Sequence, residues 1–325
     1  MNIVAEIIVG IILIIASFVL GGVLLPWIRR EIPERRERKK RQIERRRKVL
    51  IVYDRDKKTK RRHCFWEDIW EENRGIRIRS EFRFISIADE LKKLRNPALE
   101  LFDNDKTDII IVNWGAINTD PVFGSDIAQQ FFEHYSPDMR EWMKKGGIIV
   151  IEAQLASWGA IQKPFESFTK CFEGSEVEVI EELWEIGEEV SINEKCQQHP
   201  ILKKLSDEDL KLREGGVYEK KGWFPKSIAR PTIQSINEIA RHKRKVYTGW
   251  FKNHSSDWEP LILSKRNGKP VMLCRPVQGD SEVGACVLTT MFIASSEFVK
   301  LIGNFIDLPD EMRKYNRGEK TSNLV

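Results

Sequence analysis

The sequence predicts an α/β protein with a doubly wound, mainly parallel sheet, preceded by one transmembrane helix. Three observations lead to this prediction. Short continuous apolar runs recur through the first half of the chain, as in strands that are buried on both faces. Segments with helical periodicity separate these runs, which implies right-handed crossovers and helices on both faces of the sheet. A separate uncharged run of 22 residues, 7–28, stands near the N-terminus.

The first half of the folded region alternates strands and helices. The expected strands are residues 49–54 (VLIVYD), 82–87, 108–114 (DIIIVNW) and 148–153 (IIVIEA). The expected helices are residues 65–73, 88–103 and 126–145, the last of them interrupted before Pro137. Gly146 and Gly147 end this last helix and lead directly into the following strand.

Short strands dominate the second half. They are expected at residues 177–180, 188–192, 245–251, 259–264, 270–275 and 284–290. Gly268 and Gly279 fall at turns between them. A closing helix is expected over residues 298–306, and residues 308–325 are polar enough for a frayed tail. The folded domain is therefore expected to span residues 49–307.

Residues 1–28 are expected to form a membrane anchor. A helix over the uncharged run would be about 33 Å long, enough to cross a hydrocarbon core of about 30 Å. A cleaved signal peptide would need basic residues before the run, but residues 1–6 contain none. Because the basic residues all follow the run, the positive-inside rule predicts a single-pass protein of the cell membrane with its N-terminus outside and its C-terminal domain cytoplasmic.

Residues 29–48 form a basic juxtamembrane segment. They hold 12 of the 54 Lys and Arg residues against four Glu, and each Glu has a basic residue four positions later, which favours a helical stalk. Such a segment attracts anionic lipid headgroups. The residues expected at the membrane surface are Arg29, Arg30, Arg35, Arg36, Arg38, Lys39, Lys40 and Arg41. The rest of the chain is close to neutral, so nucleic acid is not the favoured partner.

The five cysteines include no CxxC pair, which argues against a disulfide framework or a zinc ribbon. We expect no metal and no cofactor. His254, Asp257 and Glu259 offer three metal-ligand types within six residues, but such groupings arise often by chance in polar loops.

The order of segments resembles the class I glutamine amidotransferase-like fold, a flavodoxin-like sheet, and within it the non-amidotransferase, trehalose-utilisation-like type. The matching segments are VLIVYD (49–54), TDIIIVNWG (107–115), WMKKGGIIVIEA (142–153), HPILKKL (199–205), WEPLILS (258–264), GACVLTTMF (284–292) and VKLIGNFID (299–307). This resemblance implies one domain over residues 49–307, with the ligand site at the carboxyl edge of the sheet.

The catalytic residues of true amidotransferases are missing from this chain. The family's Gly-x-Cys-x-Gly elbow would follow the strand at 148–153, where the sequence reads IEAQLASWG (151–159). No Cys lies between Cys64 and Cys171, and no His is followed two residues later by Glu. Since a thiolate nucleophile needs a base to activate it, glutaminase activity is not expected.

Polar residues at the strand ends are the candidate site, because ligands of open parallel sheets bind beyond the carboxyl ends of the strands. The candidate ligand-binding residues are Asp54, Asn113, Glu152, Gln154 and His199. The structural alternatives are that Glu152 and Gln154 cap loop amides and that His199 orders the turn before Pro200.

The sequence thus favours a non-catalytic ligand-binding or scaffold module at the membrane, with a protein partner or a homodimer as further options. Two alternatives stay open. One is a hydrolase that uses Glu152 with His199 or a metal. The other is a protein that binds anionic lipid or nucleic acid through residues 29–48.

Overall fold

The structure, a computed structural model, describes residues 46–53, 65–86, 100–113, 132–152, 169, 172, 175–181, 189–211, 246–247, 249–291, 293–294 and 296–316. The chain divides between Arg46 and Arg47 into two compact units, and the described residues lie almost entirely in the second. The anchor predicted over 1–28 and residues 29–45 of the basic segment lie outside the described residues. Within the described part, no helix is both long and apolar enough to span a membrane.

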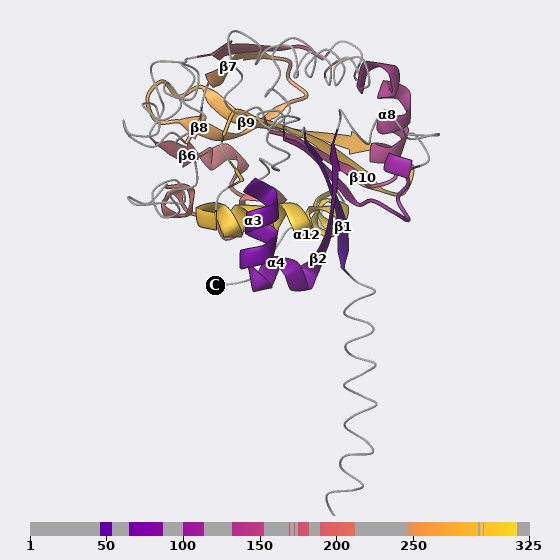
Figure 1. The fold of residues 1–325 in the computed structure, drawn as a ribbon. Coiled ribbons are helices and arrows are strands. Elements are labelled where there is room, and N and C mark those ends of the chain that lie inside the picture. The colour runs from indigo at the N-terminus through magenta and orange to yellow at the C-terminus, as the bar shows by residue number, and fades with distance from the viewer. Residues whose placement is uncertain are drawn as a thin grey trace, which may run out of the picture. The chain divides into compact units, whose positions relative to one another are not determined.

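Eight strands of the described residues form one large sheet in the order β2-β1-β3-β4-β10-β9-β8-β6 (Figure 1). The parallel strands are β1 (Arg47–Tyr53), β2 (Ser80–Ser86), β3 (Ile109–Asn113), β4 (Ile148–Glu152) and β10 (Val283–Thr289). The antiparallel extension consists of β9 (Pro270–Gln278), β8 (Glu259–Ser264) and β6 (Val190–Ile192). The predicted α/β class with a mainly parallel sheet is therefore confirmed.

The central strands are buried on both faces, as their continuous apolar sequences predict. All residues of β3, β4 and β10 are buried. Alternate side chains point to opposite faces of the sheet. Ile111 and Val150 therefore belong to one core cluster, while Val112 and Ile151 belong to the other.

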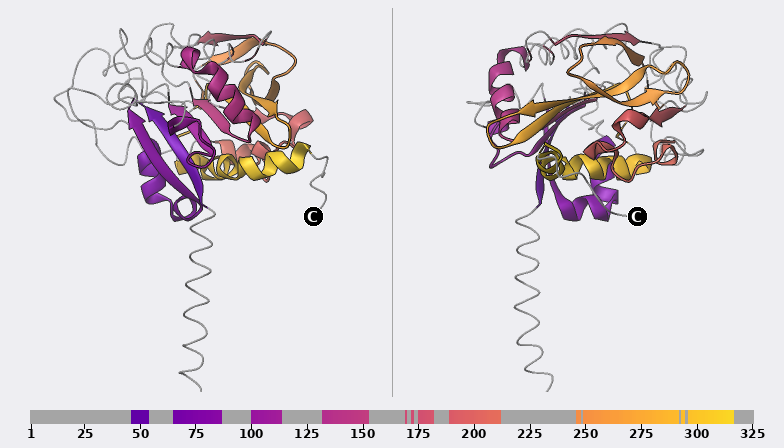
Figure 2. Two further views of the ribbon diagram at one scale, coloured as in Figure 1. Left: turned by 90° about the vertical axis from the view of Figure 1, so that its right-hand side faces the viewer. Right: turned by 180° about the vertical axis from the view of Figure 1, so that it is seen from behind.

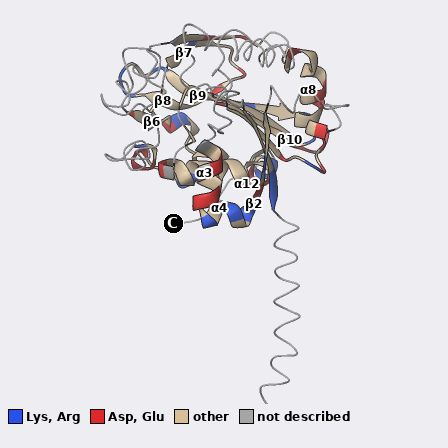
Figure 3. Ribbon diagram, viewed as in Figure 1, with Lys and Arg blue, Asp and Glu red and all other residues tan. Residues whose placement is uncertain are grey.

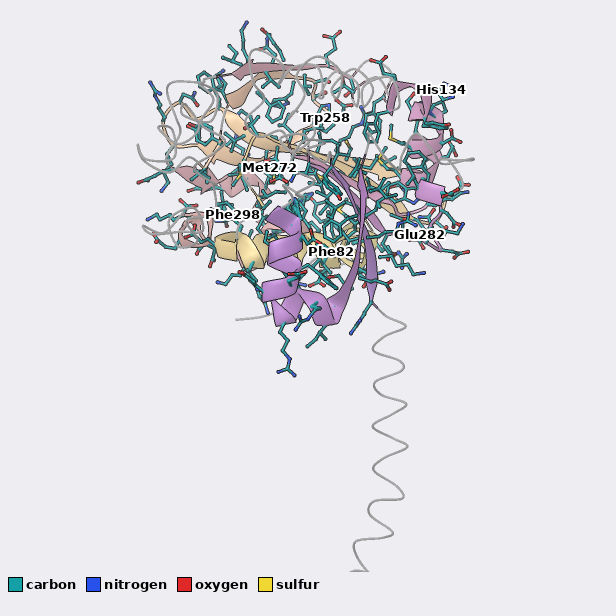
Figure 4. All side chains as sticks on the ribbon, in the orientation of Figure 1. Phe82, His134, Trp258, Met272, Glu282 and Phe298 are labelled. Carbon is teal, nitrogen blue, oxygen red and sulfur yellow. The ribbon has the colours of Figure 1, made fainter. Side chains whose placement is uncertain are left out.

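Helices cover both faces of the sheet (Figures 1 and 2). Three lie on one face: α3 (Phe65–Glu72), α4 (Arg74–Arg79) and α12 (Val299–Asn316). On the other face, α8 (Ser136–Lys144) packs through Met139, Trp142 and Met143. In Figure 4, Phe82 and Phe298 lie on the α12 side and Trp258 lies on the opposite side.

Shorter elements complete the described part of the unit. A two-stranded antiparallel sheet of β5 (Val177–Glu181) and β7 (Gly249–His254) packs on the α8 side through Val177 and Phe251. The 3-10 helices are η3 (Glu194–Cys196), η4 (Pro200–Leu202), η5 (Asp207–Leu210) and η6 (Ser296–Phe298).

Most predicted elements are confirmed within a few residues, including the helix break before Pro137. Residues 132–134 are helical, Tyr135 interrupts them, and α8 then begins at Ser136. The sequence did not predict α4. The helix expected over 88–103 lies mainly outside the described residues.

Two predicted boundaries are corrected. The closing helix does not end at 306: α12 continues to Asn316 because Leu308 and Met312 are buried in the core, so 308–316 is not a frayed tail. The helix expected over residues 29–48 does not include the last two of them. Arg47 and Lys48 belong to β1, where Arg47 pairs with Ser80 of β2 and its guanidinium binds Asp108 and Asp310.

Candidate functional site

Polar residues stand side by side at the carboxyl ends of three neighbouring parallel strands. Asn113 of β3 pairs in register with Glu152 of β4, which pairs in register with Thr289 of β10. All three are at most 2% exposed. By strand alternation they share the α12 face with Tyr53, the last residue of β1. We refer to Asn113, Glu152 and Thr289 as the polar row.

Glu152 is the best-defined member of the polar row. Its Oε2 accepts a hydrogen bond of 2.8 Å from the indole Nε1–H of Trp66, which lies on α3. Its Oε1 accepts a bond of 2.9 Å from the backbone N–H of Ala294, in the segment that leads to η6 and α12. Both donors are uncharged. The carboxylate therefore joins the end of β4 to two elements distant in sequence.

The threonines at the end of β10 bind the neighbouring backbone. The Thr289 hydroxyl donates to the carbonyl of Val271 at 3.2 Å and accepts from the N–H of Met291 at 3.0 Å. The Thr290 hydroxyl donates to the carbonyl of Gly249 at 2.6 Å and so connects the large sheet to β7. Through these contacts both threonines stabilise the carboxyl end of β10.

His199 caps a 3-10 turn. It is the N-cap residue of η4, and its Nδ1 accepts a hydrogen bond of 3.2 Å from the N–H of Ile201. A neutral ring that accepts at Nδ1 carries its proton on Nε2, and this buried Nε2 has no partner among the described residues. Burial lowers the pKa of His199 to about 4. The geometry agrees with the alternative that His199 orders the turn before Pro200.

The structure brings only part of the candidate set together. Asn113 and Glu152 are neighbours, whereas Asp54 and Gln154 lie outside the described residues. His199 contacts Tyr315 near the end of α12, with the ring centroids 5.5 Å apart, while Glu152 binds Ala294 before that helix begins. His199 and Glu152 therefore bind different segments of the chain, and the contacts of the two residues do not place them in one site.

Within the described residues, no three His, Cys, Asp or Glu side chains are grouped so that they could hold a metal ion. Asp257, one of the three candidate ligands near residue 254, is paired instead with Arg275. The guanidinium of Arg275 also lies 4.2 Å from the ring centroid of Phe172. Cys274 and Cys286 are fully buried, and burial raises the pKa of the Cys274 thiol.

Sequence reasoning missed Trp66 and Thr289. Trp66 fits an ordinary amphipathic helix, and no local pattern connects it to a carboxylate 86 residues further along the chain. Thr289 could have been predicted as a candidate site residue. Like Asn113 and Glu152, it is a polar residue at the end of an apolar strand that the sequence predicted.

No family model matches this chain, and no curated protein matches it. Five chains of solved structures match, among them the exo-beta-1,4-mannosidase Op5Man5 from Opitutaceae bacterium strain TAV5. That match has a TM-score of 0.34 and 8% sequence identity and covers 86% of this chain. This chain spans 37% of the mannosidase chain. A likeness at this level carries no argument about function.

Proposed function

We propose that this protein is a membrane-tethered ligand-binding module of the class I glutamine amidotransferase-like type, without amidotransferase catalysis. The strand order supports the proposed fold family. In β2-β1-β3-β4-β10 the chain-order numbers follow the flavodoxin-like order 2-1-3-4-5, with β10 in the fifth place. The missing Cys, His and Glu set supports the absence of glutaminase activity.

The state of Glu152 is the observation that most favours a non-catalytic role. Glu152 ends the strand that the nucleophile elbow would follow in an amidotransferase. Its two carboxylate oxygens are each bonded to a neutral donor, Trp66 and Ala294. A general base must reach a proton of the substrate or of a water. A carboxylate fully buried between a helix and a loop is suited to holding the fold together.

The proposed ligand site lies beyond the carboxyl ends of β1 and β3. In this sheet order β2 is added on one side of β1 and β3 on the other, so the strand order reverses between β1 and β3. Ligands of doubly wound folds bind at such a reversal. Tyr53 and Asn113 end the two strands on the same face. Both side chains are at most 2% exposed, so we propose them as the buried polar groups next to which a small polar ligand would bind.

The catalytic part of the proposal is tested by incubating the purified full chain with glutamine and measuring ammonia release. We expect no release above that of a heat-inactivated sample. Glutamine hydrolysis by the native chain would contradict the proposal.

The binding part is tested by thermal-shift measurements with a panel of amino acids, sugars and nucleotides. A ligand present at 100 times its Kd stabilises a protein by about 2.7 kcal/mol, which is several degrees in Tm for a domain of this size. We expect at least one compound to raise the Tm of the native chain but not that of Asn113→Leu. A panel without any shift would favour the scaffold role.

The tether is tested by protease protection in sealed membrane vesicles of known orientation. We propose that residues 7–28 cross the membrane and that the folded unit lies on the cytoplasmic side, on the basis of the basic residues 29–48. Digestion from the cytoplasmic side should remove the C-terminus. A C-terminus that is protected there and digested from the outer side would contradict this orientation.

A further inference from the structure

The short helix α4 has a basic surface. Its sequence, RGIRIR, contains three arginines and no acidic residue. Ile76 is its buried residue, while Arg74, Arg77 and Arg79 are exposed. The fold therefore displays the guanidinium groups outward and anchors the helix through one side chain and its caps.

This helix stands beside the point where the chain enters the folded unit. α4 runs directly into β2, whose first residue, Ser80, pairs in register with Arg47, the first residue of β1. Residues 29–46, with ten Lys and Arg residues, are covalently joined to that same point. Figure 3 shows the blue of α4 and of the first residues of β1 at one end of the sheet.

Among the described residues, two of the three α4 arginines make no ion pair. Arg79 is paired with Asp307 at 2.8 Å. Arg77 donates to the backbone carbonyl of Glu71, a contact that leaves its charge in place, and Arg74 makes no ion pair among the described residues. The acidic groups that flank α4 in sequence are the exposed Glu71, Glu72 and Glu81. The contact given between them and Arg74 or Arg77 is the bond from Arg77 to the backbone carbonyl of Glu71.

We propose that Arg74 and Arg77 bind the phosphate groups of anionic phospholipids in the membrane that the N-terminal segment spans. This inference rests on the proposed tether, which would join the folded unit to the bilayer through residues 29–46, the segment that leads into β1. A guanidinium binds phosphate oxygens through two parallel N–H groups, so arginine suits this contact better than lysine. The attraction should weaken with salt, because these charges are exposed.

The inference is tested on the full chain in lipid nanodiscs by hydrogen–deuterium exchange of residues 74–79. Nanodiscs of phosphatidylcholine alone are compared with nanodiscs that also contain phosphatidylglycerol. We expect exchange in α4 to slow by about fivefold or more with the anionic lipid, on the basis of the attraction per basic residue. The effect should disappear in Arg74→Gln/Arg77→Gln and in high salt.

The matched control is Lys195→Gln/Lys269→Gln, which removes two exposed positive charges elsewhere. Lys269 comes directly before β9. Because β9 is antiparallel to β10, it begins at the carboxyl ends of the parallel strands, whereas α4 lies at their amino ends. In the control variant, anionic lipid should still slow exchange in α4. If it does not, the effect depends only on the net charge of the protein, and the inference is wrong. Equal exchange in both lipids, with the chain still resistant to alkaline extraction, would overturn the inference and leave the tether intact. Release by alkaline extraction would instead overturn the tether, and the inference with it.

Discussion

Glu152 shows how one buried carboxylate can hold distant parts of a chain together. Its bonds to Trp66 and Ala294 connect the end of β4 to α3 and to the segment before α12. Burying a charged group is costly unless its hydrogen bonds are satisfied. The two donors offset that cost, so we expect the residue to matter for folding before it matters for chemistry.

Glu152→Gln should therefore destabilise the protein. The amide of Gln offers one acceptor and one NH₂ group, so one of the two donors would face another donor. We expect a loss of about 1–3 kcal/mol in the free energy of unfolding, measured by urea denaturation. Trp66→Phe should act similarly, and the double variant should cost less than the two single losses combined. Glu81→Gln, at an exposed position of β2, is the control and should change little. Unchanged stability in Glu152→Gln would favour the hydrolase alternative.

His199 should make stability dependent on pH between about 4 and 6.5. Burial lowers its pKa in the folded state from 6.5 to about 4. In that window the unfolded chain binds a proton at His199 and the folded chain does not, so stability falls as the pH falls. Above pH 6.5 both states are neutral and the effect vanishes. Over the whole window the loss is roughly 3 kcal/mol.

The variant His199→Asn isolates this effect. Its side-chain oxygen can still accept from the N–H of Ile201 as an N-cap, but it cannot titrate. The unfolding midpoint should then depend less steeply on pH, while His134→Asn, at an exposed position of the same residue type, should behave like the native chain. A slope that is unchanged in His199→Asn would show that other groups are responsible.

At the residue scale, the sequence predicts polar side chains at strand ends but not their partners. Asn113 and Glu152 could be predicted as site residues from the sequence because each ends an apolar strand. The role of the Trp66 indole could not be predicted, because a hydrogen bond between distant segments leaves no local sequence pattern. His199 was included among the candidates although it ends no strand. Its contacts are with Tyr315 of α12 and with the backbone of η4.

At the scale of elements, the turn between α8 and β4 packs against β10 without room for a side chain. A Cβ on Gly284 would overlap the backbone carbonyl oxygens of Met143 and Gly147. Gly284→Ala should therefore cost about 3 kcal/mol or more in unfolding free energy, measured by urea denaturation. Gly268→Ala is the comparison, since it meets nothing within 4 Å and has φ of +68°. It should cost only about 1–2 kcal/mol, and equal losses at the two positions would contradict the packing argument.

Elements with a strong local pattern were predicted well, and elements set by tertiary packing were not. β3 and β4 are continuous apolar runs and were found within a residue at each end. The predicted closing helix ended too early, at residue 306, because the residues that follow were interpreted from their polarity as a tail. The helix extends to Asn316 because Leu308 and Met312 are buried in the core. α4 has only six residues, too few for a helical period to be recognised.

At the scale of the whole molecule, the unit that begins at Arg47 should fold without the residues before it. Its core clusters are formed within it, and Arg47 is held by Asp108 and Asp310. A chain that begins at Arg46 should stay in the supernatant without detergent and unfold cooperatively. The full chain should sediment with membranes. Sedimentation of the shortened chain with membranes would show that the folded unit binds lipid strongly by itself.

The position of β1 has a mechanical consequence. A tether would act on the folded unit at the first residue of β1, a strand that lies between β2 and β3. A force along the axis of β1 shears the ladders on both sides together, seven register pairs with β2 and four with β3. Rupture would require these pairs to break nearly at once, unlike a hairpin that opens one bond after another. A force applied to the first residue of β1 along this strand should therefore meet high resistance.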